Sequence, residues 1–329
     1  MARVVLILTL AAAVVCGFLG SLVVGPAALT WKTSLFAVLG GDNEAARIII
    51  QEIRLPRALL GVMIGATLGL SGAALQGYLR NPLADPGVLG ISSTAALGAV
   101  LAIFTGASAA WSFALPSAAI LGAGVAVVLL RVLAGKNAGT LTLILAGVAI
   151  SSLAGALTTL TLNLSSNPFA ALEIVFWMLG SLTDRSMLHV WLAAPFMIVG
   201  WICLFASART LDAMTLGADV AQTLGTDLRR AQALIVGGTA VAVGAATAIA
   251  GAIGFVGLVV PHLLRPLVGA QPSHLLPASA LGGAVLVLAA DIAVRVIEPS
   301  RDIKLGVLTA LVGAPFFLWL VLKTRREAL

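Results

Sequence analysis

Long apolar runs alternate with short polar intervals along the whole chain. The runs are continuous and rich in Ala, Leu and Gly. About 20 apolar residues in a helix are enough to cross the roughly 30 Å hydrocarbon core of a bilayer. The pattern predicts ten spans, at residues 4–24, 56–78, 91–107, 112–132, 141–163, 188–206, 231–250, 252–267, 276–296 and 305–322. Residues 169–181 are expected to form a shorter helix near a membrane surface.

The fold class follows from the demands that lipid places on the backbone. Inside a bilayer every backbone polar group must be satisfied internally, so only helix bundles and closed barrels cross it. A barrel strand would alternate in polarity over about ten residues, whereas these runs do not alternate. We expect an all-α polytopic membrane protein with a single transmembrane domain over residues 1–329. Glycines at small-xxx-small spacing, as at Gly65, Gly69 and Gly72, favour close helix packing.

Composition supports this class and argues against a nucleic-acid partner. The chain is 60% hydrophobic and 10% charged, whereas soluble domains carry roughly 25% charged residues. The formal net charge is +6, but Lys and Arg are dispersed among loops, as positive-inside topology requires. Their bias places both termini in the cytoplasm. The N-terminal run starts like a signal peptide but continues to about Val24 without a cleavage site, so we interpret it as an uncleaved span.

Ionisable groups are scarce within the spans. Asp291 and Arg295 lie four residues apart near the outer end of the ninth span and are expected to pair. The histidines and cysteines are scattered, at His189, His262, His274, Cys16 and Cys203. They predict no metal site, no disulfide and no catalytic site. The chain lacks a G-x-x-x-x-G-K-[ST] motif, so we do not expect it to hydrolyse nucleotide itself.

Two cytoplasmic intervals are unusually polar. Residues 79–92, "LRNPLADPGVLGIS", place two prolines, an Asn and an Asp between spans, which predicts a rigid turn. Residues 209–230, "RTLDAMTLGADVAQTLGTDLRR", form the longest polar interval on the inner side. They predict a short amphipathic helix with Leu216, Val220 and Leu224 on one face. Such a helix either seals the bundle or engages a partner.

Three arginines on the outer side oppose the positive-inside trend. Arg54 and Arg57 lie three residues apart at the mouth of the second span, and Arg295 lies at the outer end of the ninth. Anchoring to lipid phosphate is one explanation. Docking of an acidic protein is the other, because arginine forms bidentate pairs with carboxylates.

The sequence resembles a known family along nearly its whole length. "RLPRALLGVMIGATLGLSGAALQGYLRNPLADPGVLGIS" (54–92) resembles the signature of FecCD-type permeases, the membrane subunits of iron–siderophore, haem and cobalamin ABC importers. Four further segments follow in the family's order, namely "LILAGVAI" (143–150), "LGADVAQTLG" (216–225), "GAIGFVGLVVPHLLR" (251–265) and "LGVLTALVGAPFFLWLV" (305–321).

The resemblance implies a type II ABC importer permease in the bacterial inner membrane. It implies a pair of permeases, for which we favour a homodimer over a heterodimer with a related permease, together with two cytoplasmic ATPases that bind ATP and Mg and a periplasmic substrate-binding protein. The permease chain itself is expected to bind no cofactor. Transport would proceed by alternating access, driven by ATP on the partner subunits.

Matched positions give expected roles to individual residues. Arg54, Arg57 and Arg295 are expected to bind glutamates of the binding protein. Coupling to the ATPase falls to Asp212, Leu216, Gly217, Ala221, Leu224 and Gly225. A cytoplasmic gate falls to Asn81, Pro82 and Thr140. The small residues Ser151, Ser152 and Gly155 of the fifth span are our candidate lining of the pathway.

The sequence leaves the cargo open. We favour an iron chelate, either a ferric siderophore or haem, with cobalamin as the alternative. Met187 and His189 suggest a haem contact, but ordinary interfacial residues explain them equally well. A gradient-driven secondary transporter is the alternative from another class, although it would need a titratable site inside the membrane.

Overall fold

The computed structural model describes residues 2–27, 29–38, 40, 43–135, 140–297 and 303–327. All regular structure in those ranges is helical. The helices in chain order are α1 (Ala2–Val23), α2 (Trp31–Val38), α3 (Glu44–Ile48), η1 (Ile49–Arg54), α4 (Leu55–Tyr78), η2 (Pro86–Leu89), α5 (Ile91–Phe104), α6 (Ala107–Ala110), α7 (Ala114–Ala134), α8 (Thr140–Leu164), α9 (Pro168–Met178), α10 (Met187–Ala206), α11 (Ala208–Met214), α12 (Ala218–Thr223), α13 (Leu228–Ala250), α14 (Val256–Val268), α15 (Pro272–Ile297) and α16 (Leu305–Glu327).

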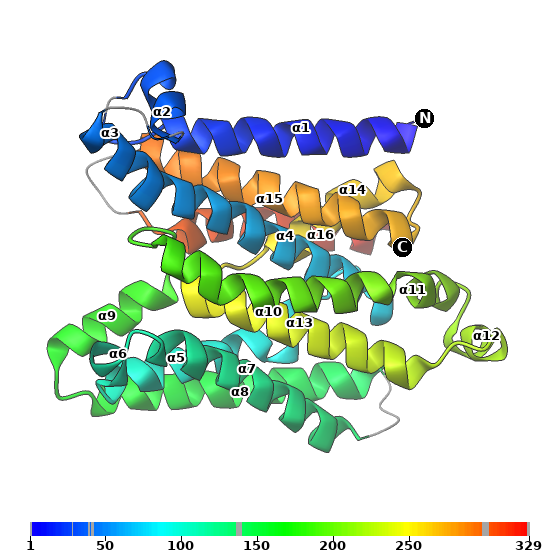
Figure 1. Ribbon diagram of the computed structural model, residues 1–329. Coiled ribbons are helices and arrows are strands. Elements are labelled where there is room, and N and C mark those ends of the chain that lie inside the picture. Colours follow the sequence, from blue (N-terminus) through cyan, green and yellow to red (C-terminus); the bar gives the residue numbers. More distant parts are fainter. Residues whose placement is uncertain are drawn as a thin grey trace.

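The long helices lie side by side in one bundle (Figure 1). The start of α1 and the end of α16 lie at the same end of the bundle as α11 and α12 (Figure 1). The short helices α2, α3, α6 and α9 lie at the opposite end. We call the α11–α12 end the inner end and the opposite one the outer end.

The predicted spans are confirmed as helices. Within the described residues, seven helices have the length and hydropathy of a membrane span. The other three predicted spans correspond to the shorter apolar helices α5, α14 and α16. The expected short helix after the fifth span is α9, near the outer end of the bundle (Figure 1).

The second span differs from its prediction at its outer end. Its helix continues outward through η1 and α3, so that one helical stretch of 35 residues covers Glu44–Tyr78. Pro56 lies in the first turn of α4 and directly follows the π-helical turn η1. The wider turn changes the hydrogen-bonding register just before the proline, whose nitrogen has no hydrogen to donate.

Glycine packing joins the central helices. Helices α4 and α13 are mostly buried, whereas α1 lies at the edge of the bundle and exposes most of its surface (Figure 1). A Cβ atom at Gly65 or Gly69 of α4 would collide with the backbone carbonyls of Gly283 and Ser279 of α15. One at Gly72 would collide with the backbone of α14. The close approach expected from the small-residue spacing is therefore confirmed at these positions.

Candidate functional site

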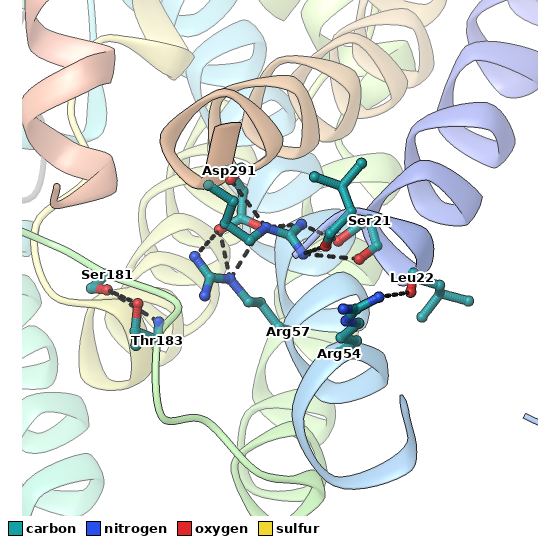
Figure 2. Close-up of polar contacts among 9 residues, drawn as sticks. Ser21, Leu22, Arg54, Arg57, Ser181, Thr183 and Asp291 are labelled. Atoms are coloured by element: carbon teal, nitrogen blue, oxygen red, sulfur yellow. Dashed lines mark hydrogen bonds and ion pairs between the residues drawn. The ribbon is translucent and has the colours of Figure 1, made fainter. Parts of the chain in front are cut away.

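One carboxylate joins two arginines at the outer ends of α4 and α15 (Figure 2). The Asp291 Oδ1 atom lies 2.8 Å from Arg57 Nη2, and Asp291 Oδ2 lies 2.7 Å from Arg295 Nη2. The pairing of Asp291 with Arg295 confirms the sequence-based prediction. The contact with Arg57 was not foreseen, because that residue lies far away in the sequence. The cluster ties α4 to α15 through charge-assisted hydrogen bonds.

Arginines also hold the end of α1. Arg54 Nη1 donates to the carbonyl oxygens of Leu22, at 2.9 Å, and Val23, at 2.7 Å (Figure 2). Arg295 Nη1 donates to the carbonyl oxygen of Ser21 at 2.9 Å. The last carbonyls of a helix have no partner within it and carry partial negative charge. The two guanidinium groups therefore cap α1 and fix it to α4 and α15.

The burial of these arginines limits which of them can contact a partner protein. Arg54 is 3% exposed and Arg295 is 9% exposed, and both donate to groups inside the protein. The Arg57 side chain is 14% exposed and is the most accessible of the three. With Asp291 counted, the cluster keeps an excess of positive charge. Docking stays a prediction, and in this conformation Arg57 is the residue best placed for direct contact.

The inner polar interval folds into two short helices. Gly217 precedes α12 with φ of +111°, and Gly225 follows it with φ of +81°. These backbone conformations strongly favour glycine, because other residues place a Cβ in steric conflict there. The two glycines therefore bound α12 on either side.

The segment α11–α12 carries an exposed apolar ridge. Leu216 and Leu224 are each 64% exposed, and Val220 is 44% exposed. Ala221 is fully buried and anchors α12 against the bundle. The side chains expected on one helical face thus project from the inner end of the molecule.

Asp212 points into the permease. Its Oδ1 atom accepts a hydrogen bond from the Ser273 backbone N–H at 2.9 Å, and its Oδ2 atom accepts from Gln271 Nε2 at 3.4 Å. Ser273 lies in the first turn of α15, so Asp212 caps that helix from a different element. This residue joins α11 to α15, a contact that no local sequence pattern predicts.

The polar turn after α4 is held by its own side chains. Asn81 Oδ1 accepts from the Leu83 backbone N–H, and Asp85 Oδ1 accepts from that of Gly87, each at 2.9 Å. Burial raises the pKa of Asp85, and the hydrogen bond from Gly87 opposes that shift. Pro82 is exposed. These contacts support the expected rigid turn.

The candidate pathway residues on α8 do not share one environment. Ser151 Oγ donates to the Gly87 carbonyl at 3.2 Å and so links α8 to η2. Ser152 and Gly155 lie on the exposed side of α8. Helix α8 begins at Thr140. The Thr140 side chain lies outside the described part of the structure, so its expected place in a gate with Asn81 stays a prediction.

A buried polar bridge near the inner end was missed from the sequence. Arg265 Nη2 of α14 donates to Gln76 Oε1 of α4 at 2.7 Å. Gln76 Nε2 donates in turn to the Gly257 carbonyl at 3.2 Å. A lone glutamine in an otherwise apolar span was the only available signal for this bridge, which ties α14 to α4.

Comparisons with known proteins agree over most of the chain. The profile of the FecCD transport family matches residues 12–323. The uncharacterized ABC transporter permease protein YvrB of Bacillus subtilis is 39% identical over 90% of this chain and 85% of its own. The cobalamin import system permease protein BtuC of Halobacterium salinarum is 41% identical, covering 85% of this chain and 75% of its own. The vitamin B12 import system permease protein BtuC of Citrobacter koseri is 38% identical over 87% of each chain.

A solved structure supports the same assignment. It is described as an inward-facing conformation of a putative metal-chelate type ABC transporter, with a TM-score of 0.86 and 32% identity. The match covers 96% of this chain and 98% of that one. The all-helical type II importer permease fold, with seven membrane-length helices among the described residues, agrees with these comparisons. The chain belongs to the FecCD transport family and is a permease subunit of an ABC importer.

Proposed function

We propose that this permease imports cobalamin or a closely related corrinoid. This proposal rests on the sequence identity of 41% and 38% to proteins named as cobalamin and vitamin B12 import permeases, over 85% or more of this chain. This reverses the preference for an iron chelate drawn from the sequence alone. An iron chelate remains the second candidate, favoured by the likeness to the metal-chelate type transporter. A gradient-driven carrier does not fit an ABC permease family.

The pathway forms between two copies of the chain. Support comes from α8, which exposes large apolar side chains along its length, among them Leu141, Leu145 and Leu164. Buried between two copies, this face would exclude water, while Ser152 and Gly155 would leave room for a bulky cargo. Alternating access then requires the two permeases to separate first at one membrane face and then at the other.

The ATPases bind the inner end. The exposed ridge of Leu216, Val220 and Leu224 is suited to an apolar cleft on a partner, because contiguous apolar patches exposed to water mark interaction sites. ATP and Mg reside on that partner. Motion of α12 reaches the bundle through Ala221, which is buried, and through the Asp212 cap on α15. This orientation places both termini in the cytoplasm, beside α11 and α12 (Figure 1).

The binding protein docks at the outer end. The excess positive charge around Arg57 suits glutamates on an acidic partner, and Arg57 is the direct contact. Arg54 and Arg295 act as positioning residues, because their donors are used inside the protein to hold α1.

Uptake into proteoliposomes tests this function. The permease is reconstituted with its ATPase and binding protein, and uptake of cyanocobalamin, haem and a ferric siderophore is followed in parallel. We expect uptake of cyanocobalamin only, dependent on both ATP and binding protein. Uptake of haem or the siderophore without cyanocobalamin would overturn the cargo assignment while leaving the importer assignment intact.

A further inference from the structure

Two adjoining cavities in the outer half of the molecule lie apart from the sites described above. The first has a volume of about 230 Å³, and its partly polar lining includes Glu173 of α9, Arg185 of the following loop and His189 of α10. None of these residues has a role in the transport scheme.

The Arg185 guanidinium has no anionic partner among the described residues. Its Nε atom is buried and makes no hydrogen bond, and among the described residues no carboxylate lies within ion-pair distance of its side chain. Burial lowers the pKa of this guanidinium, and the charge of neighbouring Asp184 opposes that shift. A partly buried cation without a partner is costly, so a ligand anion would be bound favourably.

His189 offers a second donor to the same cavity. The Ser186 backbone N–H donates to His189 Nδ1 at 3.1 Å, so Nδ1 carries no proton. In the neutral imidazole the proton then resides on Nε2, which can donate to a ligand. Glu173 is exposed at the cavity and supplies a negative charge. The cavity therefore presents donors for an anion together with a carboxylate for a cation.

The second cavity is apolar and adjoins the first. Its volume is about 390 Å³, and its lining includes Ile120 of α7 together with Leu192 and Phe196 of α10. Both cavities are lined by the same three residues, Pro116, Ala248 and Ile249. The pocket with charged side chains thus adjoins an apolar pocket between membrane-spanning helices.

We propose that the two cavities together bind one zwitterionic phospholipid of the outer leaflet. Arg185 and His189 Nε2 hold the phosphate, Glu173 holds the ammonium of an ethanolamine headgroup, and an acyl chain fills the groove between α7 and α10. Charge complementarity selects this occupant: an anion alone would leave Glu173 unpaired, and a free phosphate would leave the groove empty.

Native mass spectrometry of the full-length permease tests the site. The protein is equilibrated with mixed micelles of equal phosphatidylethanolamine and phosphatidylglycerol, and retained lipid is counted. We expect one phosphatidylethanolamine per chain, with retention falling about tenfold in Arg185→Gln, since a charged hydrogen-bond partner is lost. Glu173→Gln should remove the preference for ethanolamine. Arg47→Gln, an exposed arginine on outer helix α3, should retain lipid like the wild type. Equal retention in Arg185→Gln and wild type would overturn the proposal.

A second measurement on the wild-type chain avoids any effect of substitution on folding. A phosphatidylethanolamine with a photoreactive acyl chain is crosslinked in nanodiscs, and the labelled peptides are mapped. We expect labelling concentrated on α7 and α10 around Ile120 and Phe196, undiminished by added inorganic phosphate. Labelling spread evenly over other exposed helices such as α1, or loss of labelling in the presence of phosphate, would contradict a phospholipid site.

Discussion

At the scale of single residues, the Asp291 carboxylate neutralises part of the charge of two guanidinium groups. Asp291→Asn would leave Arg57 and Arg295 close together without their shared anion. Removing one partner of a buried ion pair costs about 3–5 kcal/mol, so we expect a clear drop in the midpoint of thermal unfolding in detergent. Arg57→Gln should cost less, because Asp291 keeps Arg295. Arg47→Gln, which is exposed, serves as the control. A smaller loss in Asp291→Asn than in Arg57→Gln would contradict this interpretation.

Asp85 carries a prediction about pH. Its folded-state pKa is raised above the ordinary value of 3.8 by burial. The stability it contributes is therefore fully present below the unfolded pKa and is lost as pH rises through the folded pKa. Asp85→Asn keeps an acceptor for the Gly87 N–H but cannot ionise. We expect the variant to unfold at a higher temperature than wild type at about pH 8 and at a similar temperature near pH 4. An unfolding temperature of Asp85→Asn below that of the wild type at pH 8, with no difference near pH 4, would show instead that the charged form stabilises the turn.

At the scale of elements, α4 and α15 approach so closely that a single methyl group should separate them. Gly69→Ala would place a Cβ against the Ser279 carbonyl, which is backbone and cannot turn aside. We expect loss of folded, monodisperse protein in size-exclusion chromatography. Gly124→Ala on α7 is the matched control, because nothing lies within 4 Å of its added Cβ. That control should be stabilising by about 0.5–1 kcal/mol, the helix-propensity difference between the two residues.

The elements were more predictable than the contacts between them. Continuous apolar runs locate each span. A helix in lipid satisfies its own backbone hydrogen bonds, and its side chains are apolar on every face because lipid and the protein interior are both apolar. Gly217 and Gly225 likewise marked the ends of α12, because their backbone conformations depend on local chemistry. The partners of Arg54 and Arg295 were not predictable. They are backbone carbonyls of α1, brought near only by tertiary packing, and any helix end presents the same groups.

Asp212 illustrates the same limit and gives a further prediction at this scale. The family resemblance assigns Asp212 to coupling, and its carboxylate caps α15. Asp212→Ala should free α11 from α15, so that the assembled importer hydrolyses ATP but takes up cargo more slowly. Asp212→Asn should behave almost like the wild type, because its side-chain oxygen still accepts from the Ser273 N–H. Uptake per ATP hydrolysed is the readout, and an unchanged ratio in Asp212→Ala would argue against a transmitting role.

At the scale of the whole molecule, helix α15 connects the two ends at which partners are proposed to bind. Its first turn accepts the Asp212 cap beside the α11–α12 segment, and its outer end carries Asp291 and Arg295. Because α15 packs against α4 along glycine contacts, the pair is suited to move as one rigid unit. The ends nevertheless use different chemistry, an exposed apolar ridge inside and a cationic cluster outside. Partner binding at the two ends should therefore be separable by substitution.

A paired comparison tests that separation. Leu216→Glu with Leu224→Glu places charge on the exposed ridge, and we expect loss of co-purification with the ATPase while the binding protein still docks at the outer end. Arg57→Gln should do the reverse, weakening the affinity for the binding protein about tenfold while the ATPase stays bound, since one charge-assisted contact is lost. Surface plasmon resonance with each partner measures both. If either substitution weakens the binding of both partners equally while the midpoint of thermal unfolding is unchanged, the two ends are not independent interfaces. A lower midpoint would instead attribute the loss of binding to a general loss of structure.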